Sequence, residues 1–312
     1  MQDLSFSTNP NGAQQSPMNE ADKDKNIVYM GYTAEDLATQ LDVAKTIDDL
    51  PAYQQENAEM SNKAVTSLHC FRDIQYGNDD PQKLDIFPAI ANNAPILVDI
   101  HGGGWRGGSK NLRSFPASSV TKAGIMWVPI DYGLAPNYSI HQIIDHVRSA
   151  IVWLYLNGSN YGGDPSRLYV SGNSAGGHLT GCILMPDWHK NYGVPPDIVK
   201  GACAVSGVYD LKALVHAEYG YNNELGMDIE TAQQFSPLFH LPPTGCPLVI
   251  SYGAPEPNEF RRQSRVYYEA WKDGGFPATE IVVNGAHHFA MSRQMSDPNC
   301  SLFQAVTEMI SQ

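Results

Sequence analysis

Runs of apolar residues alternate with segments of helical spacing along most of the chain. The apolar runs are bounded by glycine, proline and polar clusters, and they predict strands at residues 71–76, 83–87, 94–100, 124–130, 167–171, 200–205, 247–252 and 280–283. Helical spacing between some of these strands predicts helices at residues 143–156, 175–185 and 261–273. Nearly continuous apolar strands that alternate with helices are typical of a mostly parallel central sheet with helices on both faces. The pattern therefore predicts an α/β fold.

The N-terminal part of the chain differs from the rest. Residues 1–26 are rich in Asn, Gln, Ser, Asp and Lys, which predicts a disordered or loosely docked polar arm. Thr33, with an acid three residues later, resembles a capping box and predicts a helix to about residue 50. Pro51 fits the first turn of a second helix, to about residue 67. We therefore expect one α/β domain over residues 27–312, with an N-terminal helical cap segment at about 33–67.

Composition narrows the classes of partner. Lys and Arg together number 20 and Asp and Glu 33, so the net charge is −13 and the chain lacks the basic footprint that nucleic acids and anionic membranes require. No apolar stretch reaches the ~18 residues of a membrane span, and the N-terminus lacks the pattern of a secretory signal. The five cysteines are scattered without a CxxC pair, which indicates neither a disulfide framework nor a zinc site. We expect a cytoplasmic protein with no nucleic-acid partner, no membrane partner and no metal.

A serine motif follows one of the predicted strands. Gly172-Asn173-Ser174-Ala175-Gly176 matches G-x-S-x-G, with a strand before it and a helix after it. Small residues on both sides of the serine permit a sharp turn that holds Ser174 at the carboxyl end of the strand. The helix N-terminus directs backbone N–H groups toward developing negative charge. A glycine-rich turn with a surface serine is the alternative, but the strand–turn–helix context favours a nucleophile.

A second motif, His101-Gly102-Gly103-Gly104-Trp105, directly follows the strand at 94–100. Consecutive glycines let the backbone approach a ligand closely and present its amides. A loop of this kind after the third strand of an α/β-hydrolase forms the oxyanion hole. The predicted oxyanion donors are the amides of Gly103, Gly104 and Ala175, with the register of the two glycines left open. Together the two motifs predict the α/β-hydrolase fold.

A serine nucleophile needs a base, which in this fold comes last in the chain order serine, acid, histidine. The segment Gly-Ala-His-His-Phe at 285–289 follows the last predicted strand. His288 is the predicted base, and its neighbour His287 could exchange roles with it. The other candidates lack this placement and are interpreted as structural or surface residues: His178, His189, His216 and His240.

The acid is expected after the strand at 247–252. Glu256 lies in the loop itself and is the preferred candidate. Glu259 more naturally begins the next helix, where a carboxylate favours the N-terminus. Asp210, after the preceding strand, is the outside alternative. The acid would orient the imidazole and stabilise its charged form.

These residues resemble the kynurenine formamidase (arylformamidase) family of serine hydrolases, within the hormone-sensitive-lipase-like group of α/β-hydrolases. The resemblance runs from about Tyr29 to the C-terminus. It is carried by residues 29–32 (YMGY), 101–106 (HGGGWR), 131–136 (DYGLAP), 161–165 (YGGDP), 174–179 (SAGGHL), 207–211 (GVYDL), 259–264 (EFRRQS) and 288–289 (HF). The alignment with the family also favours His288 over His287, and it places Glu256 where the family usually has aspartate.

The chain departs from the family pattern at the site. Gly104 stands where these formamidases often carry an aromatic residue, and Asn173 stands where histidine is common before the nucleophile. The acid is Glu256 instead of aspartate, and the polar arm is longer than usual. Because the first two positions line the site, a substrate other than N-formylkynurenine is left open.

Motifs and resemblance together predict an arylformamidase-type amidase that acts on a small-molecule amide through an acyl-enzyme, without a metal or organic cofactor. A carboxylesterase acting on small esters with the same residues is the alternative. A non-catalytic ligand-binding protein of this fold is disfavoured, since nucleophile, base and acid are all present. The predicted substrate pocket is lined by Tyr32, Trp105, Tyr132 and Asn173, with Met185 and Trp188 as further candidates. The oligomeric state is left open, a homo-oligomer included.

Overall fold

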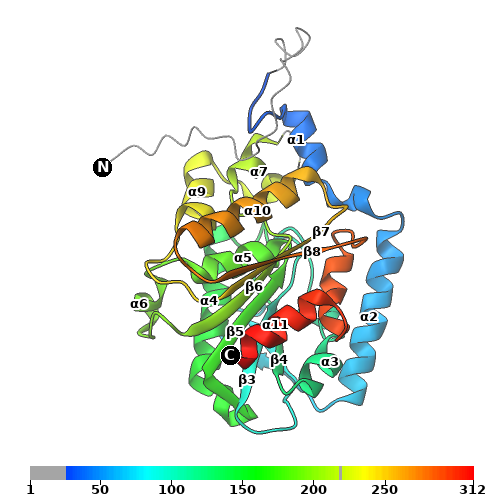
Figure 1. Cartoon of the computed structure of the whole chain (residues 1–312), viewed down its shortest axis with the longest axis vertical. Helices are drawn as coiled ribbons and strands as arrows, with labels where there is room; N and C mark the ends of the chain where they lie inside the picture. Colours follow the sequence, from blue (N-terminus) through cyan, green and yellow to red (C-terminus); the bar gives the residue numbers. More distant parts are fainter. Residues whose placement is uncertain (1–25, 218–219) are drawn as a thin grey trace.

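The computed structural model describes residues 26–217 and 220–312. Within these residues, eight strands form one sheet in the order β1-β2-β4-β3-β5-β6-β7-β8 (Figure 1). They are β1 (Phe71–Gln75), β2 (Lys83–Ile86), β3 (Ala94–Ile100), β4 (Met126–Ile130), β5 (Gly163–Asn173), β6 (Val199–Val205), β7 (Leu248–Gly253) and β8 (Ala278–Val283). The six strands β3 to β8 run parallel to one another. At one edge of the sheet, β2 pairs antiparallel with β4, and β1 pairs antiparallel with β2. The predicted, mostly parallel sheet is confirmed.

The central strands bring two loops to one edge of the sheet. In the β3–β5 pair, Ile100 lies opposite Gly172, so the two strands end nearly level with each other. β3 is buried along its whole length, as expected of a strand with helices on both sides. The segments that follow Ile100 and Asn173 therefore leave the sheet side by side at its carboxyl edge, where open α/β sheets bind their ligands.

Helices cover both faces of the sheet (Figure 1). They are α1 (Ala34–Leu41), α2 (Leu50–Ser67), α3 (Ala117–Lys122), α4 (Ile140–Asn157), α5 (Ala175–Leu184), α6 (Trp188–Tyr192), α7 (Lys212–His216), α8 (Asn222–Leu225), α9 (Ile229–Gln234), α10 (Asn258–Asp273) and α11 (Ser301–Ser311). In β3, Ile96, Val98 and Ile100 belong to the core shared with α4, α5 and α10. Leu97 belongs to the core shared with α3 and α11. This alternation is the two-residue period of a strand buried on both faces.

The first helix of the N-terminal cap segment is shorter than predicted. Thr33 caps α1, since its hydroxyl accepts a hydrogen bond from the amide of Asp36 at 3.1 Å. The helix ends at Leu41 instead of near residue 50, because Asp42 leaves the helical conformation and a 3₁₀ turn (Val43–Thr46) follows. α1 packs on α7 and α10, two helices that follow the carboxyl ends of β6 and β7.

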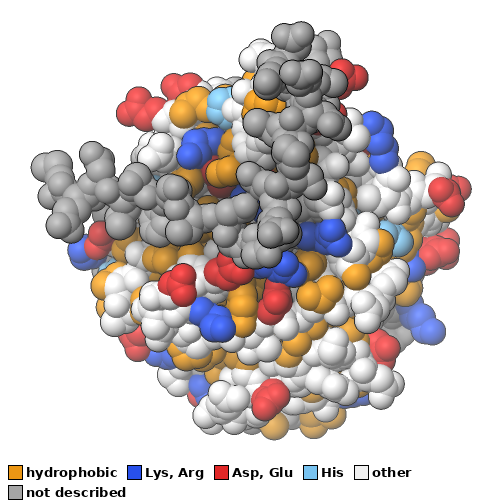
Figure 2. Space-filling view, turned by 45° about the horizontal axis from the view of Figure 1, so that its top comes forward, with side chains coloured by type: hydrophobic (Ala, Val, Ile, Leu, Met, Phe, Trp, Pro, Cys, Tyr) orange, Lys and Arg blue, Asp and Glu red, His pale blue; other side chains and the backbone are white. Residues whose placement is uncertain are grey.

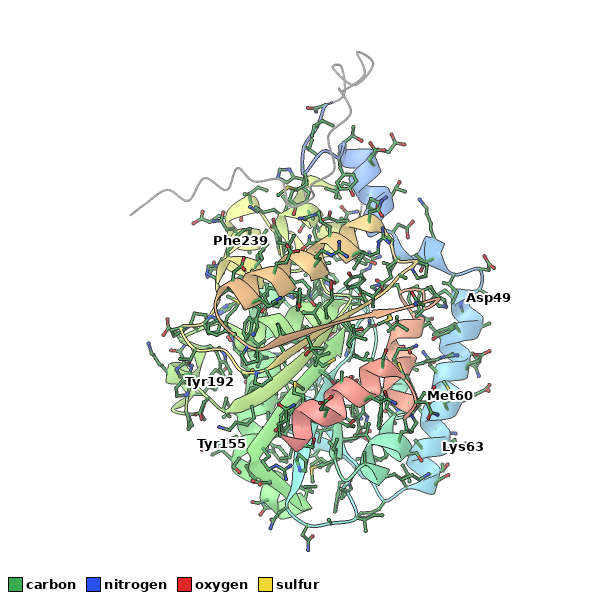
Figure 3. The ribbon with its side chains drawn as sticks, in the orientation of Figure 1. Asp49, Met60, Lys63, Tyr155, Tyr192 and Phe239 are labelled. Carbon is green, nitrogen blue, oxygen red and sulfur yellow. The ribbon has the colours of Figure 1, made fainter. Side chains whose placement is uncertain are left out.

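The second helix of this segment, α2, has Pro51 in its first turn, as predicted. Figure 3 shows Asp49 at the start of α2, with Met60 and Lys63 farther along it; both of the latter are exposed. The polar arm predicted for residues 1–26 lies outside the described residues, apart from Asn26.

Charges of both signs are interspersed on the face drawn in Figure 2. Oppositely charged side chains three positions apart in the chain form ion pairs, such as Lys200 with Asp197 at 2.7 Å. Within the described ranges, no helix combines the length and the apolar character needed to cross a bilayer.

Candidate active site

Ser174 stands on a sharp turn between β5 and α5. Its φ of 61° and ψ of −121° are strained for a residue that carries a side chain. The turn closes because two glycines lack side chains. A Cβ at Gly176 would collide with the carbonyl oxygen of Ile100, and one at Gly172 with the carbonyl oxygen of Gly176. The predicted strand–turn–helix therefore has a steric reason for each glycine, and it holds Ser174 at the N-terminus of α5.

A buried pair of an acid and a histidine follows the last two strands. His288 Nδ1 lies 2.7 Å from Glu256 Oε2, and the two residues are 1% and 3% exposed. A carboxylate can only accept, so Nδ1 carries the proton. The other oxygen, Oε1, accepts from the Ser206 hydroxyl at 2.6 Å and from the Gly253 amide at 2.7 Å. Nε2 of His288 is left as an acceptor; it is buried and has no hydrogen-bond partner in the described part of the chain.

The two other candidate acids have different partners. Glu259 lies in the first turn of α10, where it accepts hydrogen bonds from Arg262 at 2.7 and 2.8 Å and from Gln263 at 2.9 Å. Asp210 accepts from the Tyr29 hydroxyl at 2.9 Å. The structure thus brings Glu256 to the imidazole of His288, and it places the alternatives in a neighbouring polar network.

The neighbouring histidine, His287, points to another part of the molecule. Its ring contacts Tyr53 of α2 edge-on, with centroids 5.5 Å apart. Burial and the nearby His288 and Arg293 lower the pKa of His287. The Tyr53 hydroxyl also donates to the carbonyl of Phe289 at 3.2 Å. α2 therefore holds the loop that carries His288.

The glycine loop after β3 lies against the serine turn. A Cβ added at Gly102 would be 3.1 Å from Cβ of Ser174 and 2.7 Å from the Asn173 carbonyl oxygen. Gly103 and Gly104 both have positive φ, 120° and 61°, which favours glycine. The structure brings the predicted oxyanion loop and Ser174 together. In its described part it forms no hydrogen bond between Ser174 and His288; such bonds are often long in unliganded enzymes and tighten with substrate.

Tyr132, predicted to line the substrate pocket, supports this loop from behind. It is 1% exposed, its hydroxyl donates to the His101 carbonyl at 2.6 Å, and its ring stacks on that of His101 with centroids 4.2 Å apart. His101 Nε2 lies 3.6 Å from Asp131. Burial lowers the pKa of His101, although Asp131 opposes this shift. Tyr132 therefore acts on the site through the backbone of the loop.

Trp105 also points into the core. It is 1% exposed, and its indole N–H donates to His178 Nδ1 at 3.2 Å. His178 Nε2 is 2.8 Å from the carbonyl of Phe235, to which it donates. Burial lowers the pKa of His178 to about 4, so this histidine is neutral at pH 7. The interpretation of His178 as structural agrees with these contacts.

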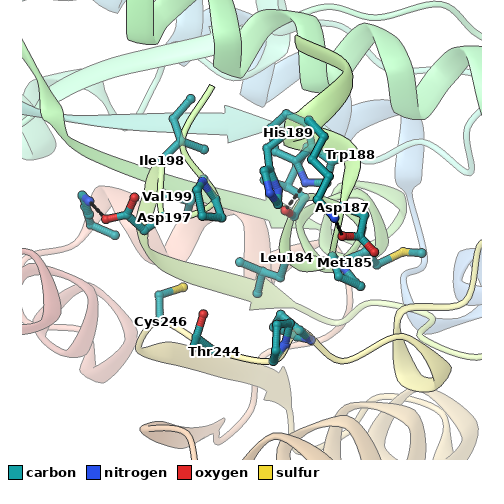
Figure 4. Close-up of a pocket in the computed structure, with 18 of the residues that line it drawn as sticks. Leu184, Met185, Asp187, Trp188, His189, Asp197, Ile198, Val199, Thr244 and Cys246 are labelled. Atoms are coloured by element: carbon teal, nitrogen blue, oxygen red, sulfur yellow. Dashed lines mark hydrogen bonds and ion pairs between the residues drawn. The ribbon is translucent and has the colours of Figure 1, made fainter. Parts of the chain in front are cut away.

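The remaining pocket candidates are dispersed. Asn173 is 8% exposed, and its Nδ2 has no hydrogen-bond partner among the described residues. Tyr32 lines a cavity of about 440 Å³ beside Arg261 and Arg262 of α10. Met185 and Trp188 line a cavity of about 500 Å³ at the end of α5 (Figure 4). Ser174 caps the other end of this helix, roughly 15 Å away, so we exclude these two residues from the site.

Two residues near the site were not predicted. The Ser206 hydroxyl donates a hydrogen bond to Glu256. The carbonyl of its neighbour Val205 accepts a hydrogen bond from the Ser174 amide at 2.8 Å. This dipeptide thus connects the serine turn to the acid. The position of Ser206 directly after the predicted strand at 200–205 is the available sequence signal. Tyr221, the residue preceding α8, packs against Gly104; nothing in the sequence indicated that contact.

Comparisons with known proteins show the family of this chain. The model of the BD-FAE family matches residues 84–270. Kynurenine formamidase of Danio rerio is 32% identical over 258 residues, covering 80% of this chain and 85% of the relative. The chain therefore belongs to the kynurenine formamidase family of α/β-hydrolases. Esterase LipQ of Mycobacterium tuberculosis is 28% identical over 243 residues, 69% of this chain and 56% of the relative.

Solved structures support the fold of this formamidase-like chain. An esterase of Pyrobaculum calidifontis superposes with a TM-score of 0.67 at 19% identity, covering 88% of this chain and 94% of the esterase. Family and fold together identify the protein as an arylformamidase-like hydrolase of amide or ester bonds. Among the described residues, no group of three or more His, Cys, Asp or Glu side chains is arranged to hold a metal ion.

Proposed function

We propose that this hydrolase cleaves an aryl formamide, or a related acylated or carbamoylated amine, through an acyl-enzyme on Ser174. The observation that carries the proposal is the buried Glu256–His288 pair, which leaves Nε2 of His288 as an acceptor. A strained serine turn beside a glycine loop supplies the other two parts that acyl transfer needs.

The proposed reaction has two halves. Ser174 Oγ attacks the substrate carbonyl carbon while its proton moves to His288 Nε2. The tetrahedral intermediate then collapses, the bond from carbon to the leaving nitrogen breaks, and the proton on Nε2 passes to that nitrogen. Water attacks the resulting acyl-serine in the second half, with His288 taking its proton and returning it to Oγ. The products are a carboxylic acid and an amine.

The chain's own dipoles stabilise the charges that develop. The oxyanion is assigned to the amides of Gly103, Gly104 and Ala175, each contributing roughly 3–4 kcal/mol in comparable sites. Ala175 is the first residue of α5, whose N-terminus adds a favourable dipole. Glu256 stabilises the imidazolium that forms on His288.

A carboxylesterase with the same residues is the second candidate. The departures at Gly104 and Asn173 support it, because Asn173 directly precedes Ser174 and Gly104 belongs to the loop whose Gly102 lies against the serine turn. The relative named as an esterase is consistent with either candidate.

The test compares substrates and a nucleophile variant of the full chain. The purified protein is assayed on N-formylkynurenine, on N-formylated and carbamoylated anilines and on p-nitrophenyl acetate, and it is labelled with a fluorophosphonate. We expect Ser174→Ala to abolish labelling and to reduce turnover by several orders of magnitude. Ser67→Ala, at an exposed serine of α2, should leave both unchanged. Labelling retained in a folded Ser174→Ala protein would disprove the assignment, and a preference for the ester would favour the second candidate.

A further inference from the structure

The space beside the oxyanion loop is filled by a residue distant in sequence. Gly104 carries no side chain, and a Cβ placed on it would overlap Cδ1 and Cε1 of Tyr221. The tyrosine ring therefore lies where a side chain at position 104 would project. It adjoins the residue whose amide is assigned to the oxyanion.

The ring of Tyr221 is held by the loop that it covers. Trp105 meets it edge-on, with centroids 6.1 Å apart and an interplanar angle of 78°. The Arg106 guanidinium lies 5.0 Å from the ring centroid and forms an ion pair with Glu224 of α8 at 2.6 Å. Two consecutive residues of the loop thus fix both the ring and the helix that follows it.

Beyond the ring there is unfilled space. A cavity of about 500 Å³ lies between the loop and the N-terminal cap segment, lined by Tyr221, Arg106 and residues of α1 with the turn that follows, such as Leu41. The tyrosine borders both Gly104 and this cavity. Removing the ring would join the space beside the oxyanion loop to the cavity.

The position of the ring indicates which part of a substrate it meets. The leaving group must lie near His288 Nε2, which protonates it. His288 is surrounded by Glu256, Phe260 and Phe289. Tyr221 instead contacts the loop that holds the carbonyl oxygen. Of the two substituents of the carbonyl carbon, the acyl group is the one directed away from His288, and it is therefore the one that a ring on this loop can meet.

We propose that Tyr221 determines acyl specificity: its ring closes the acyl side of the site at Gly104 and restricts the enzyme to short acyl groups such as formyl and acetyl. This inference rests on the proposed function of Ser174. The aromatic side chain beside the oxyanion loop thus comes from Tyr221, which follows β6, and position 104 itself is glycine.

The experiment uses p-nitrophenyl esters with acyl chains from acetate to octanoate, so that the leaving group stays constant. We expect Tyr221→Ala to raise the octanoate-to-acetate ratio of kcat/KM by about tenfold or more, since each newly buried methylene contributes about fourfold. Tyr221→Phe keeps the ring and should retain the wild-type ratio. Tyr192→Ala, on α6 (Figure 3), is the matched control and should also retain it.

A second variant tests the contact itself. Gly104→Ala places a methyl group against the ring, so it should lower kcat/KM more in the wild type than in the Tyr221→Ala background. If active Tyr221→Ala keeps the wild-type octanoate-to-acetate ratio, the inference is overturned while the function of Ser174 stands. The same holds if the variant differs from the wild type only when the leaving group of acetate esters is varied. A wild-type protein that neither hydrolyses these esters nor reacts with a fluorophosphonate would overturn both.

Discussion

Replacing Glu256 with glutamine exchanges one carboxylate oxygen for an NH₂ group. We expect this change to move the proton of the neutral His288 ring from Nδ1 to Nε2. Oε1 accepts hydrogen bonds from Ser206 and Gly253, so only the carbonyl oxygen of a glutamine can take that position. The amide NH₂ would then face His288 Nδ1, which is 2.7 Å from Oε2 in the wild type. Since an NH₂ group can only donate, Nδ1 must become the acceptor and the proton must move to Nε2. The imidazole could no longer take a proton from Ser174.

We expect Glu256→Gln to lower kcat by roughly 10³- to 10⁴-fold, the size of loss seen when the carboxylate of such a triad becomes an amide without a change in geometry. The loss has an electrostatic part as well. Glu256 and His288 are almost completely buried, so the carboxylate stabilises the imidazolium more strongly than it would in water.

Hydrolysis of p-nitrophenyl acetate measures this loss, and circular dichroism with urea denaturation checks that the variant is folded. Glu259→Gln is the matched control, because the carboxylate of Glu259 binds Arg262 and Gln263 and not His288. Its kcat, calculated per folded molecule, should equal that of the wild type. Glu256→Asp keeps a carboxylate and should retain more activity than Glu256→Gln. A folded Glu256→Gln protein with wild-type turnover would refute the reasoning.

Two further predictions concern buried side chains. Ser206→Ala removes one of the donors to Glu256 and should lower kcat/KM by about 10- to 100-fold, since a hydrogen bond to a charged group contributes ~1.5–3 kcal/mol. Ser251→Ala loses only a bond to the carbonyl of Ile281 and should stay near wild type; equal losses would contradict the assignment. Burial lowers the pKa of His178 to about 4, whereas an unfolded imidazole titrates near ~6.5. The unfolded chain then binds more protons as pH falls from about 6.5 to about 4, so the free energy of unfolding attributable to His178 should drop by ~2 kcal/mol between pH 7 and pH 5. In urea denaturation His178→Gln should flatten that dependence, and an unchanged slope would exclude this cause.

The parts of the fold that could be predicted are those whose causes are local. β3 is a continuous apolar run because both of its faces are buried, and the serine turn is marked by the two glycines that its closure requires. α1 ends early because Asp42 leaves the helical conformation, although the helical pattern continues past it. The short helices α6 to α9 contain too few residues to show a period.

The direction of a side chain was harder to predict than its position. Trp105 follows the oxyanion glycines, which suggested the substrate pocket. Positive φ at Gly103, Gly104 and Trp105 itself reverses the chain, and the indole turns into the core to meet His178. Tyr132 likewise reaches the loop from behind. Proximity along the chain does not show which side of a loop a ring occupies.

Two of the departures from the family pattern, at positions 256 and 104, explain why the remaining contacts could not be predicted. Glutamate is one methylene longer than aspartate. At position 256 its Oε1 accepts hydrogen bonds from the amide of Gly253 at the end of β7 and from the hydroxyl of Ser206 after β6. Glycine at 104 removes a side chain, and Tyr221 occupies the space. In both cases one partner, Ser206 or Tyr221, lies far away in the chain and is brought near only by tertiary packing. One sequence shows that a residue is unusual, but the residue that accommodates it is determined by tertiary contacts. The motifs therefore predict which groups meet at the proposed site, whereas the proposed acyl preference depends on a contact, Gly104–Tyr221, that no motif contains.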